Sequence, residues 1–431
     1  MTSKLDIHTL EVIRKSFKSG FVKSIGMIAS LLTSLFLARM LGAQGLGVIN
    51  LANKLGMIFL ILTMFGFQNA IIKLVAISKE TLDIDGISST LKTSLVFNGI
   101  ISLLIASMGA LLLPLVLDIW FHSQDMYMPL LIMFIMLIPQ TISRVYGSAL
   151  IGYGKIWQAN LVNQSLSSLI VAFGLLLCWI LDVVLTPVRV LVIYALGRVI
   201  LVFVVKLLWE QIFKSSRRAQ YNFQPMLKMA VPLLLVSGTG VIESNVDTIM
   251  LGGLGTLKDV GIYSVAARLG LLTALISMVV NSAISPKLAS LYNDSRIAEL
   301  EIMVQRVTKG LTFAGIVFVT FFILAGSWLL DFWGPEFREA YLVLIFISIG
   351  QFFKVATGAS GHILIMCGHE KTMSYISVSA LIFNIILNFI FIKFMGALGA
   401  AIATAITVAM SNVIRVYFVH KKLDISIIKL H

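Results

Sequence analysis

Two stretches of ten residues decide the fold: GVINLANKLG at residues 47–56 and GIYSVAARLG at residues 261–270. A glycine, an alanine, a basic residue and a leucine match in kind along them. The pairs Met64/Met278 and Lys73/Lys287 follow at the same separation, which we call the repeat offset. This offset, from position 47 to position 261, is almost half the chain of 431 residues, so it indicates two halves built on one plan.

The composition is that of a polytopic membrane protein. Hydrophobic residues make up 58% of the chain and charged residues 12%, and the mean hydropathy is +0.98. A soluble protein carries about twice that share of charge. Cys178 and Cys367 stand far apart in apolar runs, so neither a disulfide framework nor a metal knuckle is indicated.

Twelve stretches are long and apolar enough to cross a bilayer, which takes about 20 residues each. They are residues 18–41, 46–74, 90–117, 127–151, 158–181, 187–211, 226–252, 260–288, 308–330, 340–366, 372–394 and 397–419. Their connections leave no room for a soluble catalytic domain, so we expect no enzyme. The predicted division is a cytoplasmic interfacial segment 1–17, an N-terminal lobe 18–211, a cytoplasmic linker 212–225, a C-terminal lobe 226–419 and a cytoplasmic tail 420–431.

The distribution of positive charge predicts the orientation of the chain. With the amino terminus in the cytoplasm, the cytoplasmic connections and ends carry 21 Lys and Arg residues, and the opposite side carries 5. Cytoplasmic loops are enriched in Lys and Arg, so both termini are expected in the cytoplasm. The net charge of +13 is therefore mainly a topology signal, and it gives no reason to expect nucleic acid as a partner.

Six spans per half bring both halves into the membrane in the same direction, so the repeat is parallel. The predicted fold is all-α, with about twelve transmembrane helices in two six-helix lobes around a central cavity. Transporters built from such repeats bind substrate between the halves and rock them alternately.

Seven deep ionisable residues are the candidate functional residues. An ionised side chain at mid-bilayer costs at least ~3 kcal/mol, so it normally faces a partner or a water-filled cavity. The predicted substrate-binding cations are Lys54, Arg144, Arg198, Arg268 and Lys354, and the deep acids are Glu243 and Asp247.

The imbalance between these charges favours an anionic substrate. Two acids cannot pair with five cations, and an uncompensated cation in low dielectric needs water or an anion. Arginine also suits bidentate contact with phosphate. Glu243 and Asp247 stand one helical turn apart and could hold one proton or Na⁺ to couple transport to an ion gradient. An ion pair between Glu243 and Arg268 is the structural alternative.

Longer motifs around these residues carry a family resemblance. The segment FLARMLGAQGLGVINLANKL, residues 36–55, resembles the signature between the first and second helices of polysaccharide transporters, the Wzx-type flippases. The segment PLLLVSGTGVIESNVDTIMLGG, residues 232–253, followed by VGIYSVAARL, resembles their signature between the seventh and eighth helices, with Asp247 at the matching position. These flippases belong to the multidrug/oligosaccharidyl-lipid/polysaccharide exporter superfamily.

The resemblance implies two six-helix lobes and a transport function. The implied activity is export of an undecaprenyl- or other polyprenyl-pyrophosphate-linked oligosaccharide, such as an O-antigen unit of lipopolysaccharide, across the bacterial cytoplasmic (inner) membrane. It implies membrane lipids and polysaccharide polymerase machinery as partners, and no cofactor apart from H⁺ or Na⁺ as a coupling ion.

Other classes fit the residues less well. A cation-coupled multidrug exporter of the same superfamily needs acidic or aromatic cavity walls, whereas basic residues prevail in these spans. Lipid II flippases typically carry two further helices at the carboxyl end, and we expect none here. A polysaccharide polymerase or glycosyltransferase usually has a long external loop, and an ATP-driven pump needs a phosphate-binding loop with lysine. A purely structural scaffold leaves the deep cations unexplained.

Overall fold

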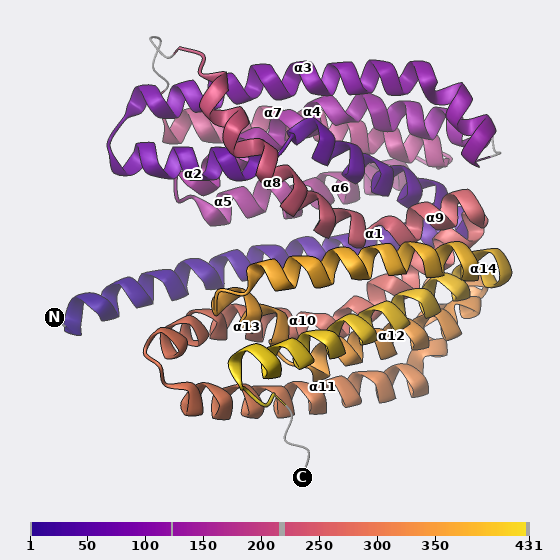
Figure 1. The fold of residues 1–431 in the computed structure, drawn as a ribbon. Coiled ribbons are helices and arrows are strands. Elements are labelled where there is room, and N and C mark those ends of the chain that lie inside the picture. Colours follow the sequence, from indigo (N-terminus) through magenta and orange to yellow (C-terminus); the bar gives the residue numbers. More distant parts are fainter. Residues whose placement is uncertain (1, 122–123, 215–219, 428–431) are drawn as a thin grey trace. The chain divides into compact units, whose positions relative to one another are not determined.

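The computed structural model describes residues 2–121, 124–214 and 220–427, and nearly all of them are helical. In the first half of the chain the elements are α1 (Thr2–Met64), α2 (Phe67–Glu80), α3 (Ile84–Val116), η1 (Leu117–Phe121), η2 (Gln124–Met126), α4 (Tyr127–Gly152), α5 (Ile156–Asn160), η3 (Leu161–Leu166), α6 (Ser167–Ile180) and α7 (Pro187–Ile212). In the second half they are α8 (Phe223–Glu243), α9 (Val246–Leu254), α10 (Leu257–Asn293), α11 (Ile297–Asp331), η4 (Pro335–Ala340), α12 (Tyr341–Ala356), α13 (Ser360–Met366) and α14 (Glu370–Leu423) (Figure 1).

The chain forms two compact units. Unit 1 comprises Met1–Leu41 and Leu51–Ile242, and unit 2 comprises Gly42–Asn50 and Glu243–His431. Each unit therefore includes a segment from the other half of the sequence: α8 belongs to unit 1, and residues 42–50 belong to unit 2. We call residues 42–50 the docked segment.

One helix lies at the centre of each unit. In unit 1, α4 packs against α2, α3 and α7, and in unit 2, α12 packs against α10, α11 and α14. Tyr127 at the start of α4 and Tyr341 at the start of α12 are separated by the repeat offset. Left-handed turns recur at the same offset, at Gly154 and Gly368 and again at Asp182 and Gly396. The repeat seen in two short motifs thus extends along both halves.

The docked segment meets α10 at a symmetrical crossing of glycines. A Cβ atom on Gly47 would collide with the carbonyl oxygen of Leu257, and one on Gly261 would collide with the carbonyl oxygen of Ala43. Ala43 and Leu257 are separated by the repeat offset, as are Gly47 and Gly261. The two copies of the repeated sequence therefore pack on each other, and glycine is required because only a residue without a Cβ allows this approach.

Two long helices change direction at a single glycine. α1 breaks at Gly42 (φ 69°), and α14 breaks at Gly396 (φ 52°). A carboxylate receives the first free amide after each break, since Ala43 N donates to Glu336 Oε1 at 2.9 Å and Ala397 N donates to Asp259 Oδ1 at 3.2 Å. Carboxylates suit these positions because a helix N-terminus has unpaired amides and a partial positive charge.

The described residues contain nine helical stretches long and apolar enough to span a membrane. Two of them, Ser24–Met64 and Glu370–Leu423, include the breaks at Gly42 and Gly396 and so correspond to two predicted spans each. The predicted span 226–252 falls on α8 and α9. Large apolar side chains stand outward, with Leu111 80%, Leu324 81% and Phe394 84% exposed, as expected of helices that face lipid.

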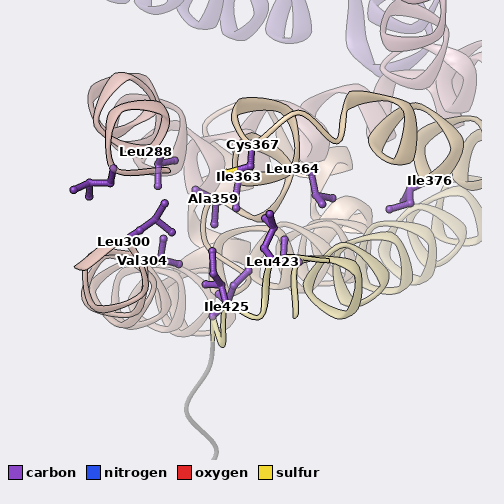
Figure 2. Packing of buried hydrophobic residues seen from close by; sticks show 13 residues of the cluster. Leu288, Leu300, Val304, Ala359, Ile363, Leu364, Cys367, Ile376, Leu423 and Ile425 are labelled. Carbon is purple, nitrogen blue, oxygen red and sulfur yellow. The ribbon is translucent and has the colours of Figure 1, made fainter. Parts of the chain in front are cut away.

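A buried apolar cluster closes one end of unit 2. Figure 2 shows side chains from α10, α11, α13 and α14 meeting there, among them Leu288, Leu300 and Ile363. α14 runs to Leu423, beyond the end of the predicted span, and a left-handed turn at Asp424 then brings Ile425 into the cluster. Residues 424–427, expected in a cytoplasmic tail, are therefore part of the packed unit.

We expect Gly47→Ala to destabilise the protein by about 1–3 kcal/mol, because the added methyl group overpacks the crossing with α10. Gly310→Ala is the matched control, since nothing lies within 4 Å of a Cβ at that helical glycine. Thermal unfolding of the purified protein measures both variants. If Gly47→Ala unfolds at the wild-type temperature, the close approach to Leu257 is not a constraint on the fold.

Candidate functional site

Asp247 is the buried carboxylate of unit 2. α8 ends at Glu243, and α9 begins at Val246 after a turn, so Asp247 lies in the first turn of a new helix. Its side chain is 9% exposed. The amides at a helix N-terminus favour a negative charge, which partly offsets the cost of burying this one.

Three neutral side chains hold the Asp247 carboxylate. Tyr263 on α10 donates its hydroxyl hydrogen to Oδ2 at 2.7 Å, and Thr404 on α14 donates to the same oxygen at 2.8 Å. Asn388, also on α14, donates from Nδ2 to Oδ1 at 2.7 Å. Among the residues that the structure describes, no lysine or arginine forms an ion pair with Asp247.

Further oxygens surround this carboxylate. Asn388 Nδ2 also lies 2.9 Å from Asn384 Oδ1, and the buried Asn388 Oδ1 has no hydrogen-bond partner. One carboxylate, two amide oxygens and two hydroxyl oxygens therefore gather where α9, α10 and α14 meet. Oxygen atoms are the ligands of hard cations, and a lone buried carboxylate is equally able to take up a proton. No three His, Cys, Asp or Glu side chains converge within the described part of the chain.

The repeat has no second copy of this site. At the repeat offset, the chain has uncharged and mostly apolar residues in place of the four site residues: Thr33 for Asp247, Ile49 for Tyr263, Gly174 for Asn388 and Val190 for Thr404. The buried carboxylate therefore belongs to one half of the repeat alone.

Glu243 does not join Asp247. The prediction that the two acids share a helical turn is wrong, because the helix is interrupted between them. Glu243 is exposed, and the charges of Lys354 and Arg415 interact with it. The ion pair with Arg268, the structural alternative, is absent from the salt bridges of the described residues, where Arg268 Nη2 donates to Asn50 Oδ1 at 3.3 Å.

Unit 1 buries two arginines without an acid. Arg144 on α4 and Arg198 on α7 lie close enough for their charges to repel, and no acidic side chain among the described residues acts on either. Arg198 Nε is buried without a hydrogen-bond partner. Lys54 is half-buried on the second part of α1, one helical turn after the docked segment.

Unit 2 has a similar pair of cations. Lys354 on α12 and Arg415 on α14 affect each other electrostatically. Arg415 Nη1 donates to Asn412 Oδ1 at 3.3 Å, while its buried Nε has no partner. The sequence reasoning missed Arg415 because it was counted with the positive charges of the carboxyl end. Its spacing of one turn from the polar pair Ser411–Asn412 is the signal that could have revealed it.

Comparison with known proteins places the chain in a family. A family model described as "Polysaccharide biosynthesis protein" matches residues 12–292, and the MatE model matches residues 232–390. The chain belongs to the polysaccharide biosynthesis protein family. The predicted resemblance is thereby confirmed, and the family consists of transporters rather than enzymes.

Two curated relatives of this family member match about half of its length. The capsular polysaccharide biosynthesis protein CapF of Staphylococcus aureus is 26% identical over 198 residues, which are 46% of this chain and 50% of CapF. The probable low-salt glycan biosynthesis flippase Agl15 of Haloferax volcanii is 27% identical over 222 residues, 50% of this chain and 46% of Agl15. The chain thus spans about half the length of the curated relatives it matches.

Two solved structures have the same fold. A multidrug resistance MATE family transporter in an inward-facing conformation has a TM-score of 0.76 at 14% identity and covers 93% of this chain and 94% of its own. The lipid II flippase MurJ in an inward closed conformation has a TM-score of 0.71 at 17% identity and covers 94% and 87%. The predicted all-α, twelve-helix, two-lobe membrane fold is confirmed, while the central cavity stays a prediction.

We expect Arg198→Gln to stabilise this polysaccharide family protein by about 0.5–2 kcal/mol, because it removes a buried charge that repels Arg144. Thermal unfolding in detergent measures the change, and Arg306→Gln, at an exposed position on α11, is the control with no expected shift. A lower unfolding temperature for Arg198→Gln would mean that a protein group compensates this arginine.

Proposed function

We propose that the protein is a flippase that exports a polyprenyl-pyrophosphate-linked oligosaccharide by alternating access. Membership of the family supports transport of a lipid-linked polysaccharide precursor. The single observation that carries the anionic substrate is the pair of buried arginines, Arg144 and Arg198, which have no acid beside them among the described residues. Selection keeps such a destabilising pair where a ligand supplies the missing negative charge.

The pyrophosphate is the group that fits this excess of charge. Guanidinium groups bind phosphate oxygens in a bidentate manner, and Arg198 and Arg415 each have a buried Nε without a partner. The proposed substrate-binding cations are the five predicted ones, Lys54, Arg144, Arg198, Arg268 and Lys354, with Arg415 added beside Lys354. O-antigen is one oligosaccharide of this class.

A multidrug exporter is the second candidate, since a MATE transporter has the same fold. An organic cation would need a carboxylate available to it. Asp247 instead directs both oxygens at Tyr263, Thr404 and Asn388, and Glu243 lies near two cations. The charges therefore favour an anion over a cation.

We assign the coupling ion, H⁺ or Na⁺, to Asp247. A cation bound there would meet the carboxylate, the unpartnered Asn388 Oδ1 and the hydroxyl oxygens of Tyr263 and Thr404. Uptake of a positive charge neutralises a carboxylate that is costly to bury. Because no second carboxylate occupies the repeat mate, the coupling ion would act on one half of the protein.

The proposed location is the cytoplasmic membrane with both termini in the cytoplasm, where the lipid-linked precursor is made. Two features support it: the excess of Lys and Arg on that side and the outward apolar surface. Membrane lipids and the polysaccharide polymerase that would use the exported unit are the proposed partners.

We expect Lys54→Gln to reduce flipping of a fluorescent polyprenyl-pyrophosphate oligosaccharide in proteoliposomes by about 10–100-fold, the value of a charged hydrogen bond of roughly 1.5–3 kcal/mol. Lys54→Glu should be worse than Lys54→Ala because it reverses the field. Lys73→Gln, an exposed lysine on the neighbouring α2, is the control and should flip normally. Full activity of Lys54→Glu would rule out the cationic site at this position.

We expect Asp247→Asn to abolish the dependence of flipping on a Na⁺ or pH gradient while substrate binding stays within about threefold of wild type. The amide keeps the shape of the site but has no charge for the ion. Glu243→Gln, tested alone, should keep the gradient response, because Glu243 lies outside the Asp247 site. If the Asp247→Asn and Glu243→Gln double variant still exports under a gradient, coupling takes place elsewhere.

A further inference from the structure

Tyr263 stands between the Asp247 site and the docked segment. Its hydroxyl contacts Asp247, while its backbone lies two residues after Gly261, where α10 crosses the docked segment. No role has been assigned to this tyrosine above beyond its hydrogen bond. Its position raises the question of whether the ion site and the crossing act on each other.

The docked segment is held mainly by α10. Leu257 and Gly261 of α10 meet the backbone of Gly47 and Ala43, and Arg268, two turns further along α10, donates to Asn50. The bond from Ala43 N to Glu336 comes from another element, η4. A small movement of the first three turns of α10 would therefore disturb most of these contacts.

The same part of α10 is tied back to the ion site by a closed set of contacts. Asp259 forms a capping box with Thr256 at the start of α10, and its Oδ1 also accepts the amide of Ala397 on α14. Two turns later on α14, Thr404 reaches the Asp247 carboxylate. Asp247 thus touches α10 through Tyr263 and α14 through Thr404, and Asp259 joins those two helices.

The two hydroxyl groups share one carboxylate oxygen. Tyr263 and Thr404 both donate to Asp247 Oδ2, and their own oxygens lie 3.5 Å apart. A proton on Oδ2 turns that acceptor into a donor, and a metal cation occupies its lone pairs and attracts the hydroxyl oxygens instead. In either case the Tyr263 hydrogen can no longer point at Oδ2, and the ring must shift or rotate its hydroxyl.

We propose that Tyr263 is a positioning residue that transmits the occupancy of the Asp247 site to the docked segment, so that ion binding loosens residues 42–50 from α10. This inference rests on the ion site proposed above. The docked segment continues directly into Asn53 and Lys54 on α1, so the ion would act on the helix that carries a substrate-binding cation.

The surroundings of Asp247 make Tyr263 the suitable link. α9 packs against α10 and α14. Among the described residues of those helices, Lys258 pairs with Glu339, Asp259 with Thr256, and Lys393 lies over the ring of Phe389. Tyr263 is the titratable side chain that these helices bring into contact with the carboxylate.

Hydrogen–deuterium exchange of the full-length protein in detergent tests the inference. The reporter is the set of backbone amides in residues 42–50, compared in Na⁺ and K⁺ at equal ionic strength and across pH, after correction for intrinsic exchange. In the wild type, the ion that binds Asp247 should accelerate exchange of these amides by about 5–150-fold, the usual range of coupling between two sites. Ion affinity is measured in parallel with radioactive Na⁺ and by proton uptake.

The Tyr263→Phe variant should keep ion affinity within about threefold and lose the exchange response. Tyr341→Phe is the matched control: it removes a hydroxyl bonded to the carbonyl oxygen of Ile323, away from Asp247, and should respond like wild type. Asp247→Asn should lose both ion binding and the response. Because ion affinity is measured separately, general damage by Tyr263→Phe would show as loss of both readouts.

The remaining outcomes separate the inference from the proposed function. If Tyr263→Phe still shows the wild-type response, or loses ion affinity together with it, Tyr263 does not transmit occupancy. If the wild type binds an ion through Asp247 and the docked segment does not respond, the ion site stands and the coupling is overturned. If the wild type binds neither Na⁺ nor a proton at Asp247, the ion-coupling part of the proposed function fails, and this inference fails with it.

Discussion

The free-energy cost of burying a charge away from water shapes the interior of both units. A buried ion needs a partner of opposite charge, several neutral hydrogen bonds, or a ligand. Asp247 has the second solution, with donors from Tyr263, Thr404 and Asn388. Arg144 and Arg198 have no acid beside them within the described residues, and this difference separates a site prepared for a small cation from one prepared for an anion.

The internal repeat is a structural symmetry with a chemical asymmetry. The central helices α4 and α12, the left-handed turns and the glycine crossing all follow one offset. The buried carboxylate does not, since a threonine takes its place in the first half. A transporter that must respond to one ion and one substrate gains from this arrangement, because a single occupied site then favours one conformation over another.

The sequence predicted the coarse fold well because hydrophobic length and charge balance depend on the bilayer alone. It also found Asp247 and the deep cations, because charges are rare in spans. It missed the three partners of Asp247, since an ordinary Tyr, Thr or Asn in a span is more often a contact between helices, and only tertiary packing brings residues 263, 388 and 404 to position 247. It also placed Glu243 beside Asp247, because a continuous helical period gave no sign of the turn at Ser244 and Asn245.

The docked segment has a consequence for how the protein is made. Gly47 leaves the ribosome almost half a chain length before Gly261, its partner at the crossing. At about 5–20 residues per second, the interval is roughly 10–40 s. During that time the first helices are already inserted, and the glycine face of residues 42–50 has no α10 to pack on. The two halves therefore cannot mature independently: a segment synthesised early waits in the membrane for the second copy of its own sequence motif.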